Sequence, residues 1–389
     1  MAWRILLALT FARMSMGFQF QAVPALSEAL VASGAMSYAG VGTLTGVYLI
    51  PGVVVSLVGG WLGSRFSDTV IVMTALVLMS GGGFAGWVVS GFDALLFWRL
   101  VAGIGAVCLN VFATKMAGDW FESRSDLPAA MGVLVSSWPF GLALAALVVP
   151  SFEARFGASF AELVPIVFCA VSLVVVALVW SPPDARGKMT EGSSPSSLSA
   201  SEWKLVLIAG SIWGIYNVGF VGVIAWVPGM LEDMGANPLK AAARASLIGW
   251  TAILSVAAGG WLAARLHRKD SLALASFCGS AGLLLILPFI GSAATSVAPM
   301  LILGLLLGPA APMIMTLPVS VSRAEVRAKA MGLYFALYYL CMGTALPLLG
   351  ALRDATGSAT APPYAAAGCM ILSSLLWIVF RTLQNVSDR

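Results

Sequence analysis

The feature of this sequence that most restricts its fold is a series of apolar runs, each about 20 residues long, that recur along the whole chain. A helix of that length, at 1.5 Å per residue, crosses the roughly 30 Å hydrocarbon core of a bilayer. Strands of a membrane barrel would be about ten residues long and would alternate polar with apolar side chains. The continuous runs therefore predict an all-α integral membrane protein.

Twelve runs are long enough to span a membrane. We place them at residues 4–26, 38–62, 69–90, 93–117, 128–150, 160–180, 204–230, 243–265, 271–291, 296–319, 328–350 and 362–382. The only long polar stretch, residues 181–203, is rich in Ser, Pro and Gly, as flexible linkers are. We therefore expect a six-helix N-terminal half over 1–180, a cytoplasmic linker over 181–203 and a six-helix C-terminal half over 204–389.

The composition agrees with this class. Of 389 residues, 60% are hydrophobic and 10% are charged, against about 25% charged in a typical soluble domain. All five cysteines fall inside apolar runs, which favours core packing over disulfides or metal ligation. We expect no metal and no cofactor.

Basic residues predict the orientation. Only a few of the 21 Lys and Arg residues fall outside the side that would hold both termini: Arg155, Lys240, Arg244 and Arg353 on the opposite side, and Arg13 and Arg99 within spans. By the positive-inside rule both termini are cytoplasmic, and we expect a multi-pass protein of a bacterial inner membrane. The positive excess reflects topology and does not indicate nucleic-acid binding.

Two short patterns repeat at one offset. GGWLGSRFSDT begins at Gly59 and GGWLAARLHRK at Gly259, while AAMG begins at Ala129 and KAMG at Lys329. Each pair is 200 residues apart and occupies the same place in its half. This spacing indicates duplication of a six-helix unit, which is common in transporters.

These motifs carry a family resemblance over nearly the whole chain. A Gly-x-Leu and Arg turn follows the second and eighth spans, Arg99 opens an Arg-x-x-x-Gly-x-Gly run in the fourth, and SSWPFG lies in the fifth. The sequence resembles the major facilitator superfamily of secondary transporters, and within it the cyanate permease-like and nitrate/nitrite-related branch. The resemblance implies two pseudo-symmetric six-helix halves that rock around a central site. It assigns gating or conformational roles to Gly60, Arg65, Gly260, Arg265, Pro139 and Gly141.

Both copies of the turn lack the aspartate usual in this family. Its absence puts in doubt the charge latch that helps to hold the cytoplasmic side closed, and whether Asp68 compensates is left open.

Arg13 is the most unusual residue of the first span. An ionisable side chain at mid-depth costs about 2.5–3.5 kcal/mol on insertion scales, so it is expected to face a cavity or a partner. Arg13, Gly17, Gln21 and Pro24 share one helical face. We predict that Arg13 and Gln21 contact substrate; a hydrogen-bonded structural role for Arg13 is the alternative.

A second polar stripe lies on the fourth span, where Arg99, Gly103, Ala106, Asn110 and Thr114 repeat every three or four residues. The first and fourth helices are neighbours in the family, so the resemblance implies that both arginines face one cavity. We predict substrate contact for Arg99 and Asn110. A structural role for Arg99 is an equal alternative, because arginine at this position accompanies many substrates.

The acidic residues decide the expected sign of the ligand. None of the 17 lies in the middle third of a predicted span, so no buried carboxylate would neutralise the arginines. A planar guanidinium matches carboxylate, nitrate-like or phosphate oxygens. The same absence weakens a buried proton relay, and the one histidine, His267, lies in a cytoplasmic loop. Uniport, anion exchange and coupling through a rim acid such as Glu28 stay open.

The second half offers neutral polar groups. Tyr216 and Asn217 lie on the seventh span and Tyr338 on the eleventh. Amide and phenol groups inside a membrane need partners, so we predict that these three line the cavity. Simple packing is the alternative, and Trp138 is a weaker candidate.

The resulting hypothesis is a monomeric secondary transporter of a small anion, cyanate-like, nitrate-like or a carboxylate, with membrane lipid as its surroundings. Efflux of hydrophobic, drug-like compounds is the alternative. An enzyme or sensor has little support, because the sequence lacks HExxH, GxSxG and GxxxxGK[ST] motifs and paired intramembrane acids.

Overall fold

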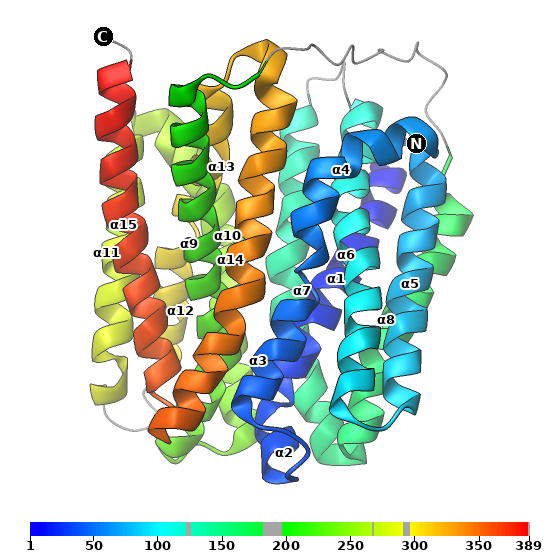
Figure 1. The fold of residues 1–389 in the computed structure, drawn as a ribbon. Helices are drawn as coiled ribbons and strands as arrows, with labels where there is room; N and C mark the ends of the chain where they lie inside the picture. The colour runs from blue at the N-terminus through cyan, green and yellow to red at the C-terminus, as the bar shows by residue number, and fades with distance from the viewer. Residues whose placement is uncertain (122–125, 182–196, 267, 291–295, 388–389) are drawn as a thin grey trace.

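The computed structural model describes residues 1–121, 126–181, 197–266, 268–290 and 296–387, and these residues form a bundle of membrane-length helices (Figure 1). Eleven helical segments are long and apolar enough to cross a membrane by length and composition. The remaining helix of that length, α1 (Ala2–Ala25), packs along α7 and α8. Its hydropathy is lower because it carries Arg13, Gln19 and Gln21. The twelve-helix prediction is confirmed.

The first six spans are formed by residues 2–179. They are α1, then α3 (Tyr38–Val47) with α4 (Pro51–Arg65), α5 (Asp68–Val88), α6 (Phe92–Phe121), α7 (Leu127–Phe156) and α8 (Ala158–Val179). A short helix that the sequence did not predict, α2 (Ser27–Ala32), follows α1. The second span is interrupted between α3 and α4, and Pro51 begins α4, where its missing N–H costs nothing.

The last six spans are formed by residues 200–387. They are α9 (Ala200–Asp233), α10 (Pro238–Leu266), α11 (Lys269–Ile286) with η1 (Leu287–Phe289), α12 (Val297–Leu307) with α13 (Ala310–Val321), α14 (Arg327–Thr356) and α15 (Ala361–Ser387). A 3-10 turn, η3 (Ala324–Val326), precedes α14. Residues 182–196 of the predicted linker, and His267, lie outside the described residues.

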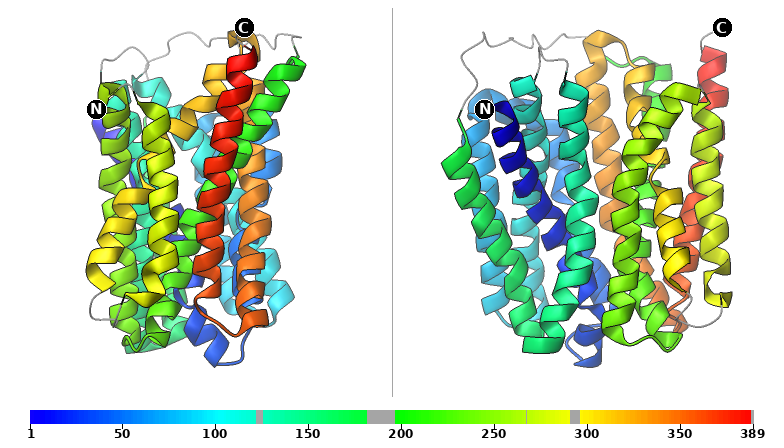
Figure 2. Two further views of the ribbon diagram at one scale, coloured as in Figure 1. Left: turned by 90° about the vertical axis from the view of Figure 1, so that its left-hand side faces the viewer. Right: turned by 180° about the vertical axis from the view of Figure 1, so that it is seen from behind.

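The two sets of six spans lie side by side, the first set blue to teal and the second green to red (Figures 1 and 2). They meet where α3 and α4 pack on α14 and where α7 packs on α10. Both chain termini lie at one end of the bundle (Figure 1), which we call the terminal end. The opposite end, which holds α2, is the distal end.

Glycine pairs allow the closest helix crossings. A Cβ at Gly42 or Gly46 of α3 would collide with backbone atoms of α14, at Leu346 and Gly343 respectively. Gly304 and Gly308 stand against α10 in the same way. Small residues at four-residue spacing let membrane helices approach closely in this way.

The tenth span is interrupted next to Pro309. α12 ends at Leu307 and α13 begins at Ala310, on either side of Gly308 and Pro309. The amide N–H of Ala311 donates to the Gly308 carbonyl, so the Leu307 carbonyl loses its ordinary helical donor. This exposed carbonyl is important for one of the predicted site residues.

Candidate functional site

Arg13 lies halfway along α1, and its guanidinium contacts neutral acceptors on two other helices. Its Nε donates to Asn110 Oδ1 of α6 at 2.7 Å. Its Nη1 donates to the Leu134 carbonyl at 2.7 Å and to Ser137 Oγ at 3.0 Å, both on α7. No described residue accepts a hydrogen bond from Nη2. The guanidinium is therefore held firmly by one edge and keeps donors available on the other.

A proline explains why α7 has carbonyls to offer. Pro139 has no N–H, so the carbonyl of Val135, four residues earlier, cannot make its helical hydrogen bond. Arg13 Nη1 approaches this carbonyl at 3.3 Å. The predicted conformational residue Pro139 and the predicted site residue Arg13 thus form one local arrangement. Gly141 supports it, because a Cβ there would collide with α1 at the Met14 carbonyl.

The Arg13 cluster reaches across to the second set of spans. Asn110 Nδ2 donates to the hydroxyl oxygen of Tyr339, on α14, at 2.8 Å. Arg13, Asn110 and Tyr339 therefore form a hydrogen-bonded chain from the first six helices to the last six. The Tyr339 ring also contacts the ring of Tyr338, with centroids 4.8 Å apart. We call Arg13, Asn110, Ser137 and Tyr339 the central cluster.

Arg99 lies elsewhere, in the wall of the first six helices. Its Nη2 donates to the carbonyls of Gln19 and Phe20 of α1, at 2.9 and 3.1 Å, and its Nε to the Leu44 carbonyl at 3.2 Å. Pro24 deprives the Phe20 carbonyl of its helical donor, and Leu44 is in the last turn of α3, where carbonyls lack partners. The guanidinium also lies over the Tyr48 ring. Arg99 thus supplies donors that two interrupted helices need.

The structure does not bring the two guanidinium groups to a shared partner. Neither arginine makes an ion pair with any carboxylate among the described residues. The expected absence of a buried counter-ion at these positions therefore holds for the part of the chain that is described. Substrate contact by either arginine stays a prediction.

Of the predicted residues in the second half, two are occupied with the protein itself. The Tyr216 hydroxyl donates to the Leu307 carbonyl, which the break in the tenth span exposes, at 2.8 Å. Asn217 Nδ2 donates to the Trp213 carbonyl of its own helix. Tyr338 differs, because its hydroxyl has no hydrogen-bond partner among the described residues. Its ring stacks between Trp213 and Tyr339, so it borders the central cluster.

Two tryptophans near the centre carry unused donors. The buried indole Nε1 atoms of Trp138 on α7 and Trp213 on α9 have no hydrogen-bond partner within the part of the chain that the structure describes. Trp138 packs on the Phe20 ring, 5.2 Å between centroids, and Trp213 on Tyr216. A buried donor without an acceptor costs about 1–3 kcal/mol. The surroundings of the central cluster are therefore richer in donors than in acceptors.

The distal end is closed by charged side chains from both sets of helices. Arg353 of α14, 6% exposed, makes a two-pronged ion pair with Glu28 of α2, at 2.6 and 3.1 Å. Tyr38 donates its hydroxyl to the same carboxylate at 2.7 Å. The Asp354 carboxylate accepts from the backbone N–H groups of Tyr38 and Ala39, at the start of α3. We call these residues the distal latch.

Gln21 lies apart from the central cluster. It lines a small distal cavity, and its side-chain oxygen is buried without a hydrogen-bond partner among the described residues.

At the terminal end, Arg65 and Arg265 are exposed and lie over the rings of Trp61 and Trp261. A Cβ at Gly60 would meet open space, and one at Gly260 only Pro312. The gating roles of these loop residues stay predictions.

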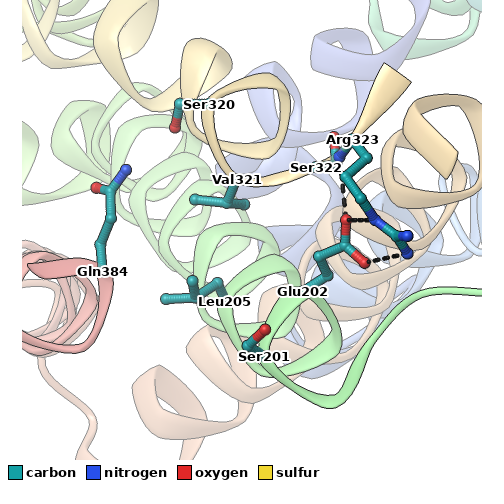
Figure 3. Close-up of a pocket in the computed structure, with 8 residues that line it drawn as sticks. All are labelled: Ser201, Glu202, Leu205, Ser320, Val321, Ser322, Arg323 and Gln384. Carbon is teal, nitrogen blue, oxygen red and sulfur yellow. Dashed lines mark hydrogen bonds and ion pairs between the residues drawn. The ribbon is translucent and has the colours of Figure 1, made fainter. Parts of the chain in front are cut away.

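Asp68 has a partner within its own set of helices, Lys115 at the end of α6. A second ion pair joins Glu202, near the start of α9, to Arg323, two residues after the end of α13. Both residues line a pocket of about 270 Å³ (Figure 3). The Glu202 carboxylate raises the pKa of the Arg323 guanidinium. Both pairs tie helices within one half. No described group of His, Cys, Asp and Glu residues is arranged to hold a metal ion.

Sequence reasoning missed three parts of this arrangement. It ranked Tyr338 above Tyr339, although Tyr339 makes the hydrogen bond across the halves. It named no role for Ser137, and it placed Glu28 and Arg353 at the rim without pairing them. The sequence offered one signal for the pairing of Glu28 with Arg353, namely that rim residues of opposite charge lie in different halves. No local pattern shows which of them meet.

Comparison with known proteins agrees with the fold. The family model of the major facilitator superfamily matches residues 5–346. A cyanate transport protein of Escherichia coli (strain K12), CynX, is 23% identical over 351 residues, which cover 86% of each chain. A hexuronate transporter of Bacillus subtilis (strain 168) is 21% identical over 236 residues, 56% of this chain and 53% of that protein.

Solved structures show the same architecture. The POT family transporter PepTSo superimposes with a TM-score of 0.75 at 13% identity, covering 98% of both chains. An autoinhibited POT family peptide transporter gives 0.74 at 13% identity, covering 97% of both. At these identities the likeness concerns the fold alone. With the family model matched over most of its length and its helices arranged in that fold, this chain belongs to the major facilitator superfamily.

Proposed function

We propose that this transporter carries a small anion, and that the guanidinium of Arg13 is the group that binds it. The observation that carries the proposal is the state of this side chain. It lies at mid-helix, fixed by Asn110, Leu134 and Ser137, while its Nη2 has no acceptor among the described residues. A positive charge with free donors and no protein counter-ion attracts an anion and repels a cation.

The chemistry around Arg13 favours the same ligand. Among the described residues the Tyr338 hydroxyl has no hydrogen-bond partner, and the indole N–H groups of Trp138 and Trp213 have none either. These are hydrogen-bond donors, which an anion can accept from. The two curated relatives point the same way by their names, because cyanate and hexuronate are both anions.

The hydrogen bond between Asn110 and Tyr339 suggests how binding affects the conformation. It joins the Arg13 side of the site to α14. An anion that draws Arg13 or Asn110 toward itself competes with this bond, so its affinity differs between the two arrangements of the halves. A ligand shifts a conformational equilibrium only through such a difference in affinity.

The test is ligand-dependent stability followed by uptake. Purified protein is heated in the presence of cyanate, nitrate, monocarboxylates, hexuronates and hydrophobic cations, because a ligand at 100 times its Kd stabilises the folded state by about 2.7 kcal/mol. Uptake of the best ligand is then measured in proteoliposomes for the wild type, Arg13→Ala and Arg155→Ala. Arg155 is an exposed arginine of α7 that serves as the matched control.

We expect an anion to raise the melting temperature of the wild type and of Arg155→Ala. Arg13→Ala should remain folded and lose both the stabilisation and the uptake. If hydrophobic cations stabilise the protein and anions do not, the anion proposal is wrong. If Arg13→Ala transports the anion normally, Arg13 is not the binding group.

A further inference from the structure

A cavity near the distal latch carries a separate inference. It has a volume of about 60 Å³ and is lined by α1 and α2, α7, α9 and the start of α10. Its polar lining residues include Gln21, Glu28, Glu153 and Glu232. Because the lining comes from both sets of six helices, opening of the distal end would take this cavity apart. We call it the distal cavity.

The charges in the distal cavity do not balance. Three carboxyl groups line it, and the Arg353 guanidinium is committed to Glu28. The side-chain carboxyl groups of Glu153 and Glu232 make no hydrogen bond or ion pair with another described residue. Like charges that line one small cavity repel, and a partly buried carboxylate without a partner is unfavourable. A positive charge near these carboxylates would therefore stabilise the observed arrangement.

The other charged groups near Glu232 do not supply this positive charge. Those whose charges act on it are Glu28, Asp233, Glu153 and Arg353. The cations of the adjacent helix α10, Lys240 and Arg244, are not among the residues that line the cavity. The local balance around Glu232 is negative.

A second observation indicates what the cavity binds. The side-chain oxygen of Gln21, a residue 1% exposed, is buried at this cavity and accepts no hydrogen bond. A carboxylate cannot donate to it, whereas a protonated carboxyl group has one O–H donor. The cavity has room for about two water molecules, and no described cluster of carboxylates fits a metal ion. A proton on one of the lining carboxyl groups would reduce the negative charge and add an O–H donor to the cavity.

We propose that the distal cavity is a proton-binding site, in which Glu232 takes up a proton from distal-side water and thereby stabilises the closed distal end. Opening exposes the carboxyl group to water, where the proton returns to the same side. Acid on the distal side then favours closure, and alkaline solution favours opening. A single linked proton changes this equilibrium by up to about tenfold per pH unit. The inference does not depend on which substrate is carried.

The test is a distance measurement between two spin labels across the distal end. The labels are placed at Ala32→Cys in α2 and Leu239→Cys in α10, both exposed, after the five native cysteines are replaced by alanine. The labels are attached first, and distance distributions are then recorded in nanodiscs at pH 5 and pH 8. Thermal unfolding verifies that each variant is folded.

We expect the labelled parent to shift toward longer distances at pH 8. Glu232→Gln, which resembles the protonated group, should stay at short distances at both pH values. Asp93→Asn, which changes an exposed acid at the start of α6 that does not line the cavity, should behave as the parent. Glu28→Gln breaks the ion pair with Arg353 and should lengthen the distances even at pH 5, which verifies that the labels report opening.

Two results would overturn the proposal. One is a parent whose distance distribution is the same at both pH values while Glu28→Gln opens it. The other is a Glu232→Gln variant that keeps the pH response of the parent. A response to sodium at constant pH, with none to protons, would replace the proton by a metal cation and would equally reject the proposal.

Discussion

Arg13 and Arg99 are the two arginines inside the predicted spans, and the structure uses them differently. Each contacts a carbonyl that a proline or a helix end has left without its helical donor. Each also keeps one terminal nitrogen, Nη2 of Arg13 and Nη1 of Arg99, without an acceptor among the described residues. Arg99 makes all of its hydrogen bonds within the first six helices and lies over the Tyr48 ring, whereas Arg13 connects through Asn110 to α14. A buried charge can therefore serve as a brace or as a binding group, depending on what its last donors face.

The largest expected effect is on stability, from Arg99→Ala. The substitution leaves the carbonyls of Phe20 and Leu44, which lack a helical donor, without the donor that Arg99 supplies, at a cost of about 1–3 kcal/mol for each buried group. We expect a lower melting temperature and little folded protein in membranes, measured by thermal unfolding and size-exclusion chromatography. A stable Arg99→Ala protein that no longer binds the anion would contradict the structural role of Arg99.

Arg13→Lys should affect binding more than folding. Lysine keeps the charge but cannot hold Asn110 and Ser137 while also presenting a second edge to a ligand. Loss of a hydrogen bond to a charged group costs about 1.5–3 kcal/mol, so we expect anion affinity to fall by about tenfold to a hundredfold. Isothermal titration measures the affinity, and thermal unfolding serves as control. An unchanged affinity would show that charge alone suffices.

Pro139→Ala and Pro24→Ala form a matched pair with smaller effects. Each returns a helical donor to a carbonyl that an arginine now contacts, at Val135 for Arg13 and at Phe20 for Arg99. We expect Pro139→Ala to change anion affinity several-fold, on the order of 1 kcal/mol, and Pro24→Ala to change the melting temperature without changing affinity. The reverse assignment of the two effects would contradict the comparison.

The smallest expected effect comes from removing single hydroxyl groups. Tyr339→Phe deletes the acceptor of Asn110 Nδ2, and a neutral hydrogen bond contributes about 0.5–1.5 kcal/mol. We expect a change of a few-fold in the transport rate with anion affinity nearly constant. Tyr338→Phe should leave the melting temperature unchanged, because its hydroxyl has no partner among the described residues. Weaker anion binding by Tyr338→Phe would place this hydroxyl against the substrate.

Much of the fold could be predicted, and the reason is physical. A lipid core demands continuous apolar helices of known length, so the ends of the predicted spans agree with those of the observed helices to within six residues. The breaks between α3 and α4 and between α12 and α13, and the short helix α2, were not predicted.

The site was less predictable. Helical spacing placed Arg13 and Gln21 on one face, yet Arg13 joins the central cluster and Gln21 the distal cavity. The sequence also gave no reason to separate Tyr338 from Tyr339, which differ in their hydrogen bonds. Side chains on one helix face share a direction but not a depth, and each meets the neighbour that lies at its own level.

By itself, then, the sequence determined the class of the protein, its twelve spans and the presence of two costly positive charges inside them. Those properties follow from the composition of single segments, because transfer into lipid is nearly a sum over residues. Only the tertiary structure decided which arginine is held within the first six helices and which connects through Asn110 to α14, and which rim charges pair at the distal end. Those outcomes depend on carbonyls that prolines expose on other helices and on the crossings that bring them within hydrogen-bond reach.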